Sequence, residues 1–346
     1  MASVTQGRPA AGELDAQAPR RRPRGGLVFG VIALAYLLLG LGYSLATPLG
    51  EGIDESTHLA YVQFLQEARR LPRPEDAVGL LTDQAKHPPL YYLAVAALTW
   101  PGGLEGLVWT PNPHCCNLER PSPAVTRHLE GDRFPFAPPY RRLRLVRLLG
   151  LACGLALLWA TWSCARLLAP RRPELAPAAT ALAAFLPQFL FIQGVLNNDV
   201  LANALAALCL WAGLRVALLD ARPRDLLLLG GCLGLGLLTK LTLLAYLPYA
   251  ALALLLAARR ARSPAPLRRG LCWCALPCLA VCGWWFAWNL LVKGDLLGWS
   301  SWMEATSFLH RDRPLGQELP DYLAMQWRTF WGSFGWATVR LPEPLY

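Results

Sequence analysis

The sequence predicts an all-α membrane protein built as a bundle of transmembrane helices. Of the 346 residues, 54% are hydrophobic, and several apolar runs reach the roughly 18–20 residues that a helix needs to cross a bilayer. The formal net charge is +10, but the arginines lie in short clusters between the apolar runs. This arrangement is typical of the loops of a membrane protein and argues against a nucleic-acid-binding surface.

The first apolar run, residues 26–47, is predicted to be a retained spanning helix, because it is too long for a signal-peptide core and lacks an A-x-A-like cleavage site. Residues 1–25 before it are expected to form a disordered, basic cytoplasmic tail. Six further spans are expected, which makes seven in all, at 145–169, 175–196, 200–219, 225–242, 244–258 and 270–292.

The stretch "PPLYYLAVAALTW", residues 88–100, is expected to lie along the membrane surface. It is short and begins with two prolines, which suits an interfacial helix better than a span. If it does not cross, the Arg clusters at 19–24, 169–173, 221–224 and 258–269 all fall on one face, which is predicted to be cytoplasmic. The cluster "YRRLRLVR" (140–147) is then a local exception on the opposite face.

This topology predicts a transmembrane domain over residues 26–292, with a long first outer loop at 48–144. Residues 293–346 are expected to form an aromatic segment on the outer face, and "QWRTFWGSFGW" (326–336) within it suits a helix at headgroup level. The outer segments carry most of the unusual polar residues, so the functional site is expected there.

Cysteine gives weak evidence for a metal site. "HCC" at 114–116 could ligate zinc, but no fourth ligand follows at a suitable spacing. Cys274, Cys278 and Cys282 share a helix face within an apolar run, where small packing residues are the simpler interpretation. No metal ligands are predicted.

The first candidate site residues are Asp54 and Glu55, at the start of a short amphipathic helix in the first loop. Asp54 could simply cap this helix, with Glu55 favoured in its first turn by the helix dipole. Capping does not account for His58, which lies one helical turn after Asp54 on the same face. The alternative is a carboxylate base held at headgroup depth.

Two more candidates lie in the turn "LNND" at 196–199, where Asn198 and Asp199 begin an apolar helix. Helix capping again competes with a functional role. Lys240 ends a further apolar run, where a charge is unfavourable without a partner or an anionic ligand, although its side chain could also extend to the interface.

Cationic residues complete the predicted site. Arg144 and Arg147 open the second span at the outer surface, and Lys86 and His87 precede the Pro-Pro helix. Guanidinium groups bind phosphate oxygens in a bidentate way, so a phosphate would explain the local exception to the charge rule. Carboxylates and cations at one membrane face suit the transfer of a sugar from a polyprenyl phosphate to a hydroxyl, but also suit lipid transport.

Several motifs resemble the GT-C superfamily of bacterial membrane glycosyltransferases, which includes the protein O-mannosyltransferase-like enzymes and the lipid A aminoarabinose transferases. The resemblance runs from about Leu27 to Tyr346. It rests on "DESTHLAYVQFLQEARRLP", "KHPPLYYLAVAAL", "FPFAPPYRRLRLVRLLG", "LPQFLFIQGVLNNDVLANALAAL", "GLGLGLLTKLTLLAYLP", "WNLLVKGDLLG" and "FWGSFGW".

The resemblance implies an inverting transferase of the bacterial plasma membrane that uses an undecaprenyl- or decaprenyl-phosphate sugar. Asp54 matches the catalytic acidic position of the first loop and Glu55 its acidic neighbour, while Asp199 matches the second acidic position. His87, Arg144 and Lys240 match basic positions, His87 near the donor phosphate. Nothing in the resemblance implies a particular cofactor, a divalent metal, or an acceptor among proteins, lipids and glycans.

Two features depart from the family pattern. Arg147 stands where relatives more often have a small residue. GT-C enzymes usually have eleven or more spans, so the sequence is expected to be C-terminally truncated, or else its fold is expected to be closed by a partner. A transporter or flippase for polyprenyl-linked lipids is the alternative function. Transporters need polar groups near the bilayer midplane, whereas the predicted spans here are nearly free of charge. An inactive membrane scaffold is the third possibility.

Overall fold

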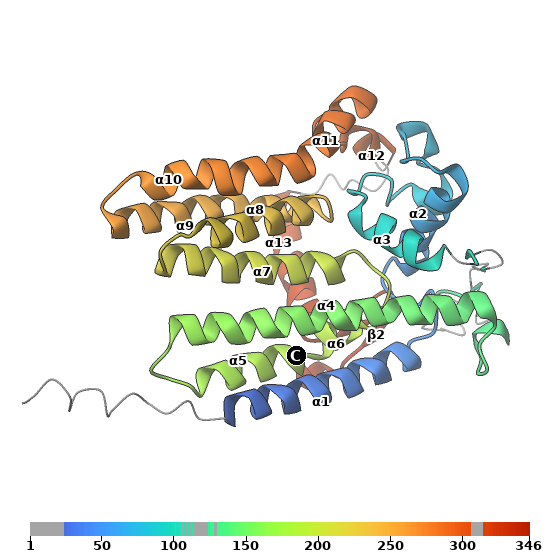
Figure 1. The fold of residues 1–346 in the computed structure, drawn as a ribbon. Helices are drawn as coiled ribbons and strands as arrows, with labels where there is room; N and C mark the ends of the chain where they lie inside the picture. The colour runs from blue at the N-terminus through green and yellow to red at the C-terminus, as the bar shows by residue number, and fades with distance from the viewer. Residues whose placement is uncertain are drawn as a thin grey trace, which may run out of the picture.

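The protein is a helical bundle with a cap of shorter helices at one end (Figure 1). The computed structural model describes residues 24–346, apart from 101, 105–106, 108–109, 111, 114–123, 128–129 and 306–313. The described residues contain helices and one two-stranded antiparallel hairpin, so the predicted all-α class is confirmed. The tail before residue 24 and the "HCC" sequence at 114–116 lie outside the described residues.

In the described residues, the bundle (Figure 1) is made of nine helices: α1 (Arg24–Ala46), α4 (Pro138–Leu168), α5 (Leu175–Ala184), α6 (Pro187–Gln193), α7 (Asp199–Leu218), α8 (Pro223–Leu237), α9 (Tyr246–Ala261), α10 (Ala265–Gly270) and α11 (Leu276–Lys293). A short 3-10 helix, Leu241–Ala245, leads into α9, and a π-helical turn, Leu271–Ala275, joins α10 to α11. In the described part of the chain α7 has a central position, because it packs against α4, α8 and α9.

The predicted count of seven spans is wrong. Among the described residues, five helices are long and apolar enough to cross a membrane, and a bent pair, α5 with α6, would make six. The pair bends by 63° because Pro187 begins α6 and holds Leu186 in an extended conformation. Helix α8 has only 15 residues, about 22 Å of helix, which is shorter than the roughly 30 Å hydrocarbon core.

Two short helices from the first loop cap one end of the bundle (Figure 1). They are α2 (Glu55–Ala68) and α3 (Leu90–Thr99). Helix α3 is apolar but has only 10 residues, in agreement with the prediction that 88–100 does not span. Elsewhere in this loop, the residues that the structure describes include three 3-10 turns, Pro74–Asp76, Gly79–Leu81 and Glu130–Asp132.

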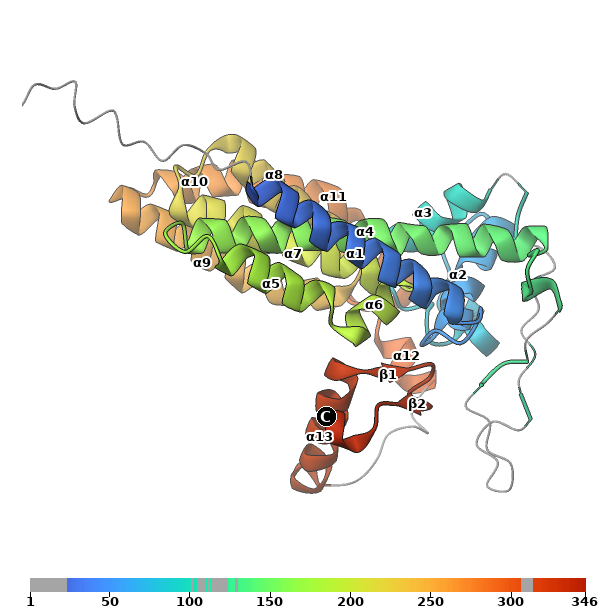
Figure 2. The same cartoon turned by 90° about the horizontal axis from the view of Figure 1, so that it is seen from below.

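The C-terminal segment forms a separate layer beside the bundle (Figure 2). It consists of α12 (Ser300–Ala305), α13 (Leu315–Trp331), the hairpin strands β1 (Ser333–Phe334) and β2 (Val339–Arg340), and a last 3-10 turn, Glu343–Leu345. The helix expected over 326–336 therefore ends at Trp331. The hairpin reaches the bundle through Phe334, whose ring lies 5.4 Å from that of Phe191 in α6.

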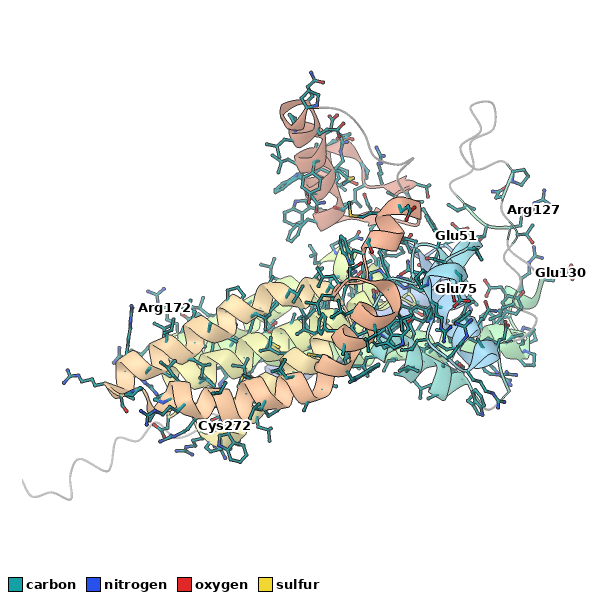
Figure 3. All side chains as sticks on the ribbon, turned by 90° about the horizontal axis from the view of Figure 1, so that it is seen from above. Glu51, Glu75, Arg127, Glu130, Arg172 and Cys272 are labelled. Carbon is teal, nitrogen blue, oxygen red and sulfur yellow. The ribbon has the colours of Figure 1, made fainter. Side chains whose placement is uncertain are left out.

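The arginine clusters of the turns between spans gather at the end of the bundle opposite α2 and α3. Figure 3 shows Arg172, in the turn between α4 and α5, far from Glu51 and Glu75, which lie near α2. The turns between α7 and α8 and between α9 and α10 lie at the same end as Arg172 (Figure 1). The clusters thus share one end, as predicted, and its cytoplasmic orientation stays a prediction.

The interior of the bundle is apolar and contains most of the described cysteines. Cys274, Cys278 and Cys282 are buried together with Cys209 and Cys232 in the core formed by α7, α8 and α11. Within the described ranges, no group of three or more His, Cys, Asp or Glu side chains is arranged to hold a metal ion. The cysteines of α11 therefore lie where small packing residues would lie.

Helix α8 packs closely against the π-helical turn before α11 at Gly230. A Cβ atom at this position would overlap the backbone carbonyl of Cys274, whereas a Cβ at the neighbouring Gly231 would meet nothing within 4 Å. The backbone of this turn cannot yield as a flexible side chain could. Close contact between α8 and the turn therefore requires glycine at 230 and not at 231.

We expect Gly230→Ala to lower the melting temperature of the purified protein, since overpacking a well-packed interior destabilises it by about 1–3 kcal/mol. Gly231→Ala is the matched control. It should leave the melting temperature unchanged or raise it slightly, because alanine favours the helix over glycine by up to about 1 kcal/mol. Equal effects of the two substitutions on thermal unfolding in detergent would contradict this packing.

Candidate active site

A polar cavity of about 390 Å³ lies where the cap meets the bundle. It is bounded by the start of α2, the loop before α3, the start of α7 and the residues that follow α8. The predicted site residues line it except for Glu55, Arg144 and Arg147, and those in the lining are Asp54, His58, Lys86, His87, Asn198, Asp199 and Lys240. Asp54 and Asp199 therefore lie on the same side of the bundle, as a shared site requires.

Asp54 immediately precedes α2 but does not cap it with its side chain. The residue has a left-handed backbone, φ 55°, and its carboxylate makes no capping hydrogen bond. Its carbonyl oxygen instead accepts bonds from the Thr57 hydroxyl at 2.7 Å and the His58 amide at 2.9 Å. A left-handed conformation is uncommon for residues other than glycine, although Asp tolerates it. The turn leaves the carboxylate available to the cavity.

The surroundings of Asp54 raise its pKa. Burial has the largest effect, because it disfavours the charged form, and the carboxylate of Asp83 adds to it, while Lys240 and Lys86 oppose it. A carboxylate with a raised pKa is a stronger base than one in water. Asp54 is thus suited to accepting a proton from a hydroxyl group in the cavity.

Asp199 and Lys240 form an ion pair in the cavity wall, with 2.6 Å between Lys240 Nζ and Asp199 Oδ1. Asp199 begins α7, but the side chain that bonds to the first turn belongs to Asn197, whose Oδ1 accepts the Val200 amide at 3.2 Å. Asp199 is therefore the partner that the charge of Lys240, at the end of an apolar run, was expected to need.

The turn that carries Asp199 is fastened to the segment that carries Lys240. Asn198 is fully buried and its side-chain amide donates to the carbonyl of Thr239 at 3.4 Å. Because Thr239 immediately precedes Lys240, this bond holds the two halves of the ion pair in register.

His58 is neutral and belongs to a hydrogen-bond chain behind the cavity. Its Nδ1 lies 2.9 Å from the hydroxyl of Tyr92, which in turn donates to Gln84 Oε1 at 3.2 Å. Because the hydroxyl proton of Tyr92 is donated to Gln84, the bond between His58 and Tyr92 must use a proton on His58 Nδ1. Nε2 of the neutral imidazole is then unprotonated and can accept a hydrogen bond. Burial lowers the pKa of His58 to about 4.

The loop before α3 contributes the second cation of the cavity. Lys86 Nζ lies 2.8 Å from Asp83 Oδ1, and burial lowers the pKa of this lysine. Burial also holds the pKa of His87 well below its usual range, so His87 offers a neutral imidazole rather than a charge. The position of this loop is fixed from α11, because Lys293 Nζ donates to the carbonyl of Ala85 at 3.0 Å.

Several residues that line the cavity are not among those predicted from the sequence. Asp83 and Gln84 line it next to Lys86, and Trp299 closes it from the segment after α11. The spacing of Asp83 and Lys86, three residues apart with opposite charges, is a signal that sequence analysis could have used. Nothing in the sequence around Trp299 indicates its contact with residues far earlier in the chain.

Glu55 lies behind the cavity rather than in its lining. It is fully buried and receives a bidentate ion pair from Arg147, with Nε at 2.8 Å from Oε1 and Nη2 at 2.6 Å from Oε2. Its oxygens also accept the amides of Gly50 at 2.8 Å and Leu196 at 2.9 Å. This carboxylate therefore binds three separate segments together.

The charge state of Glu55 follows from these contacts. Burial alone would raise its pKa, but the Arg147 charge and the hydrogen bonds outweigh burial and hold the pKa below its ordinary value of 4.5. The remaining guanidinium donors of Arg147 go to the carbonyls of Ser44, Thr47 and Pro48. The pair is thus fully satisfied inside the protein.

Arg144 also lies outside the cavity lining, contrary to its predicted place. Its Nη2 is 2.7 Å from Asp132 Oδ1, and its guanidinium lies over the ring of Phe136 with 4.4 Å to the centroid. A further bond runs to the Ser44 carbonyl at 3.2 Å. Arg144 and Arg147 thus both join α4 to protein groups at the end of α1 and in the first loop.

Residues 141–288 match a family model described as dolichyl-phosphate-mannose-protein mannosyltransferase. No curated protein and no solved structure matches the chain. The matched segment runs from the start of α4 to near the end of α11, so it contains Asn198, Asp199 and Lys240 but not Asp54 or the cap. Similarity to a membrane glycosyltransferase family therefore extends to one wall of the cavity.

We expect Arg147→Met to destabilise the protein by about 3–5 kcal/mol, because removing one partner of a buried ion pair leaves an uncompensated charge. Combining it with Glu55→Gln should restore part of the loss, since the buried charge is then gone. Arg328→Met, which breaks an exposed pair with Glu343, is the control and should change stability by less than about 1 kcal/mol.

The difference in stability between wild type and Arg147→Met should depend on pH. The folded-state pKa of Glu55 is depressed, so the pair stabilises the protein above the ordinary value of 4.5 and this contribution is lost as the pH falls below it. The difference in melting temperature between wild type and Arg147→Met should be large at pH 7 and shrink in acid. A pH-independent difference would contradict the pair's role.

Proposed function

We propose that the protein transfers a sugar from a polyprenyl-phosphate donor to the hydroxyl group of an acceptor. The observation that carries this proposal is the single cavity in which Asp54 meets Lys86 and the Asp199–Lys240 pair. The match of residues 141–288 to a polyprenyl-type mannosyltransferase family supports it. We place the cavity on the extracytoplasmic side of a bacterial plasma membrane, opposite the arginine-rich turns.

In the proposed reaction the acceptor oxygen attacks the anomeric carbon of the sugar. Asp54 takes the hydroxyl proton as the new C–O bond forms, and the bond from the anomeric carbon to the phosphate oxygen breaks. The electron pair leaves with the polyprenyl phosphate, and attack from the opposite face inverts the anomeric carbon. No step requires a further reactant.

Lys86 and Lys240 are assigned to the departing phosphate, because ammonium groups placed near developing negative charge stabilise the transition state. Asp83 and Asp199 hold these lysines in position through ion pairs of 2.8 and 2.6 Å. Asn198 and the neutral His58 and His87 are assigned to hydrogen bonds with the sugar or the acceptor. Glu55 becomes a positioning residue, and Arg144 has no assigned contact with substrate.

The alternative of a lipid transporter fits the charge distribution less well. A transporter site is expected near the middle of the membrane at broken helices. Here the charged residues that the bundle contributes to the cavity, Asp199 and Lys240, lie at the first residue of α7 and just beyond the last turn of α8. The broken pair α5–α6 reaches the cavity through Ile192 but brings no charged side chain to it.

We expect Asp54→Asn to reduce the rate of sugar transfer by about 10²–10⁴-fold, the usual contribution of a general base. The measurement is transfer of labelled sugar from polyprenyl-phosphate donors, mannose first, by the purified protein in lipid vesicles. The exposed Glu75→Gln is the control and should retain full activity. Full activity of Asp54→Asn would remove Asp54 from the mechanism. Hydrolysis of the donor by the wild-type protein would exclude the alternatives of a transporter and an inactive scaffold.

We expect Asp83→Asn to move the acid limb of the pH–rate profile to lower pH. The Asp83 carboxylate is, after burial, the largest cause of the raised pKa of Asp54. Its removal lowers that pKa, so Asp54 becomes ionised, and therefore active as a base, at lower pH. The pH dependence of kcat/KM should show this shift, Glu75→Gln should show none, and a shift to higher pH would contradict the assignment.

A further inference from the structure

A second polar cavity, of about 200 Å³, lies at the opposite end of the bundle from the candidate active site. It is bounded by the end of α7, the turn into α8 and the end of α9. Helix α7 joins the two sites, because Asp199 is its first residue and Leu218 its last. Its 20 residues span about 30 Å, one hydrocarbon thickness, so the second cavity faces the other membrane surface.

This cavity has an excess of positive charge. Its charged lining consists of four arginines and two aspartates, namely Arg215, Arg222, Arg224, Arg260, Asp220 and Asp225. Arg215 pairs with Asp225 at 2.8 Å and Arg222 with Asp220 at 3.0 Å. Arg260 donates to the carbonyl of Leu218. Within the described part of the chain, no salt bridge is recorded for Arg224 or Arg260, so these two guanidinium charges are available to an anion.

Asp225 supplies a second observation that points to a ligand. Its residue is only 3% exposed, and while Oδ1 accepts the bond from Arg215, Oδ2 is buried and has no hydrogen-bond partner among the described residues. A buried carboxylate oxygen without a hydrogen-bond donor has lost its bonds to water and gained none in return, which is unfavourable. A ligand in this cavity that brought a hydrogen-bond donor to Asp225 would remove that penalty.

We propose that this cavity binds a phosphodiester that carries a hydrogen-bond donor, and that its source is the headgroup of a membrane phospholipid. The phosphate contacts Arg224 and Arg260, and the ammonium of ethanolamine or a hydroxyl of glycerol donates to Asp225. A lipid source is favoured over a soluble phosphodiester because Leu218 and Leu219 expose 42% and 37% of their surface beside the arginines. Basic pockets between membrane helices bind lipid headgroups in this way.

The test is native mass spectrometry of the full chain in detergent, titrated with phosphatidylethanolamine, phosphatidylglycerol or phosphatidylcholine. The choline headgroup has the same phosphodiester but no donor, so wild type should bind it more weakly than the other two. Arg224→Gln combined with Arg260→Gln should weaken binding of all donor-bearing lipids about tenfold or more, the value of one charged hydrogen bond. Arg171→Gln combined with Arg172→Gln removes the same charge at the same end and should have little effect.

Each result decides the proposal. Equal lipid binding by wild type and the Arg224/Arg260 variant would overturn it, and so would the same loss in the Arg171/Arg172 control. Equal affinity for phosphatidylcholine would overturn the contact with Asp225. Competition by millimolar glycerophosphoethanolamine as strong as that by the lipid would overturn the lipid source. All four substitutions lie on exposed arginines, so an unchanged melting temperature in lipid-free detergent is expected for both variants.

Discussion

The buried ion pair between Glu55 and Arg147 fixes the geometry on which the candidate site depends. Taking two charges out of water is costly, and the attraction between them offsets that cost only if every hydrogen-bonding group is satisfied. Here Glu55 accepts four bonds and Arg147 reaches three carbonyls at the end of α1 as well as the carboxylate. The pair therefore joins α1, α2, α4 and the turn before α7 at one point.

The positions of Asp54 and Asp199 both depend on this ion pair. Asp54 immediately precedes Glu55 in the chain, so the ion pair of Glu55 also fixes the backbone of Asp54. The left-handed conformation of Asp54 then directs its carboxylate toward the cavity. Leu196, whose amide also binds Glu55, lies in the turn that leads to Asp199. The Glu55 carboxylate thus helps to set the distance between Asp54 and Asp199, which are far apart in the sequence. Such positioning matters because catalysis depends on reacting groups held in near-attack geometry.

In the proposed reaction, an anionic donor would strengthen Asp54 as a base. Lys86 and Lys240 each already have a carboxylate partner, and Asp54 adds a third carboxylate, so the cavity without substrate is not positively charged. A phosphate bound beside these lysines would add negative charge near Asp54 and raise its pKa further. Binding of the donor would therefore make Asp54 a stronger base for the acceptor hydroxyl.

The sequence predicted the helical class, the short non-spanning length of α3 and seven of the residues that line the cavity, because charged residues in apolar surroundings stand out without any structure. It could not predict partners separated by long stretches of chain. Glu55 meets Arg147 across 92 residues, and His58 meets Tyr92 through a contact between two helices of the cap. The span count failed for a local reason, since apolar composition alone does not show where Pro187 bends a run or where α8 ends.

The length of α4 explains the one cluster that contradicts the charge rule. Helix α4 has 31 residues, about 46 Å of helix, which exceeds the roughly 30 Å of hydrocarbon by several turns. Its first turns, with Arg144 and Arg147, therefore extend into the cap, where Asp132, Glu55 and the carbonyls at the end of α1 satisfy them. An arginine whose guanidinium is fully paired with protein groups gives no information about the orientation of the protein in the membrane. The exception thus arises from internal ion pairing, and no bound phosphate is needed to account for it.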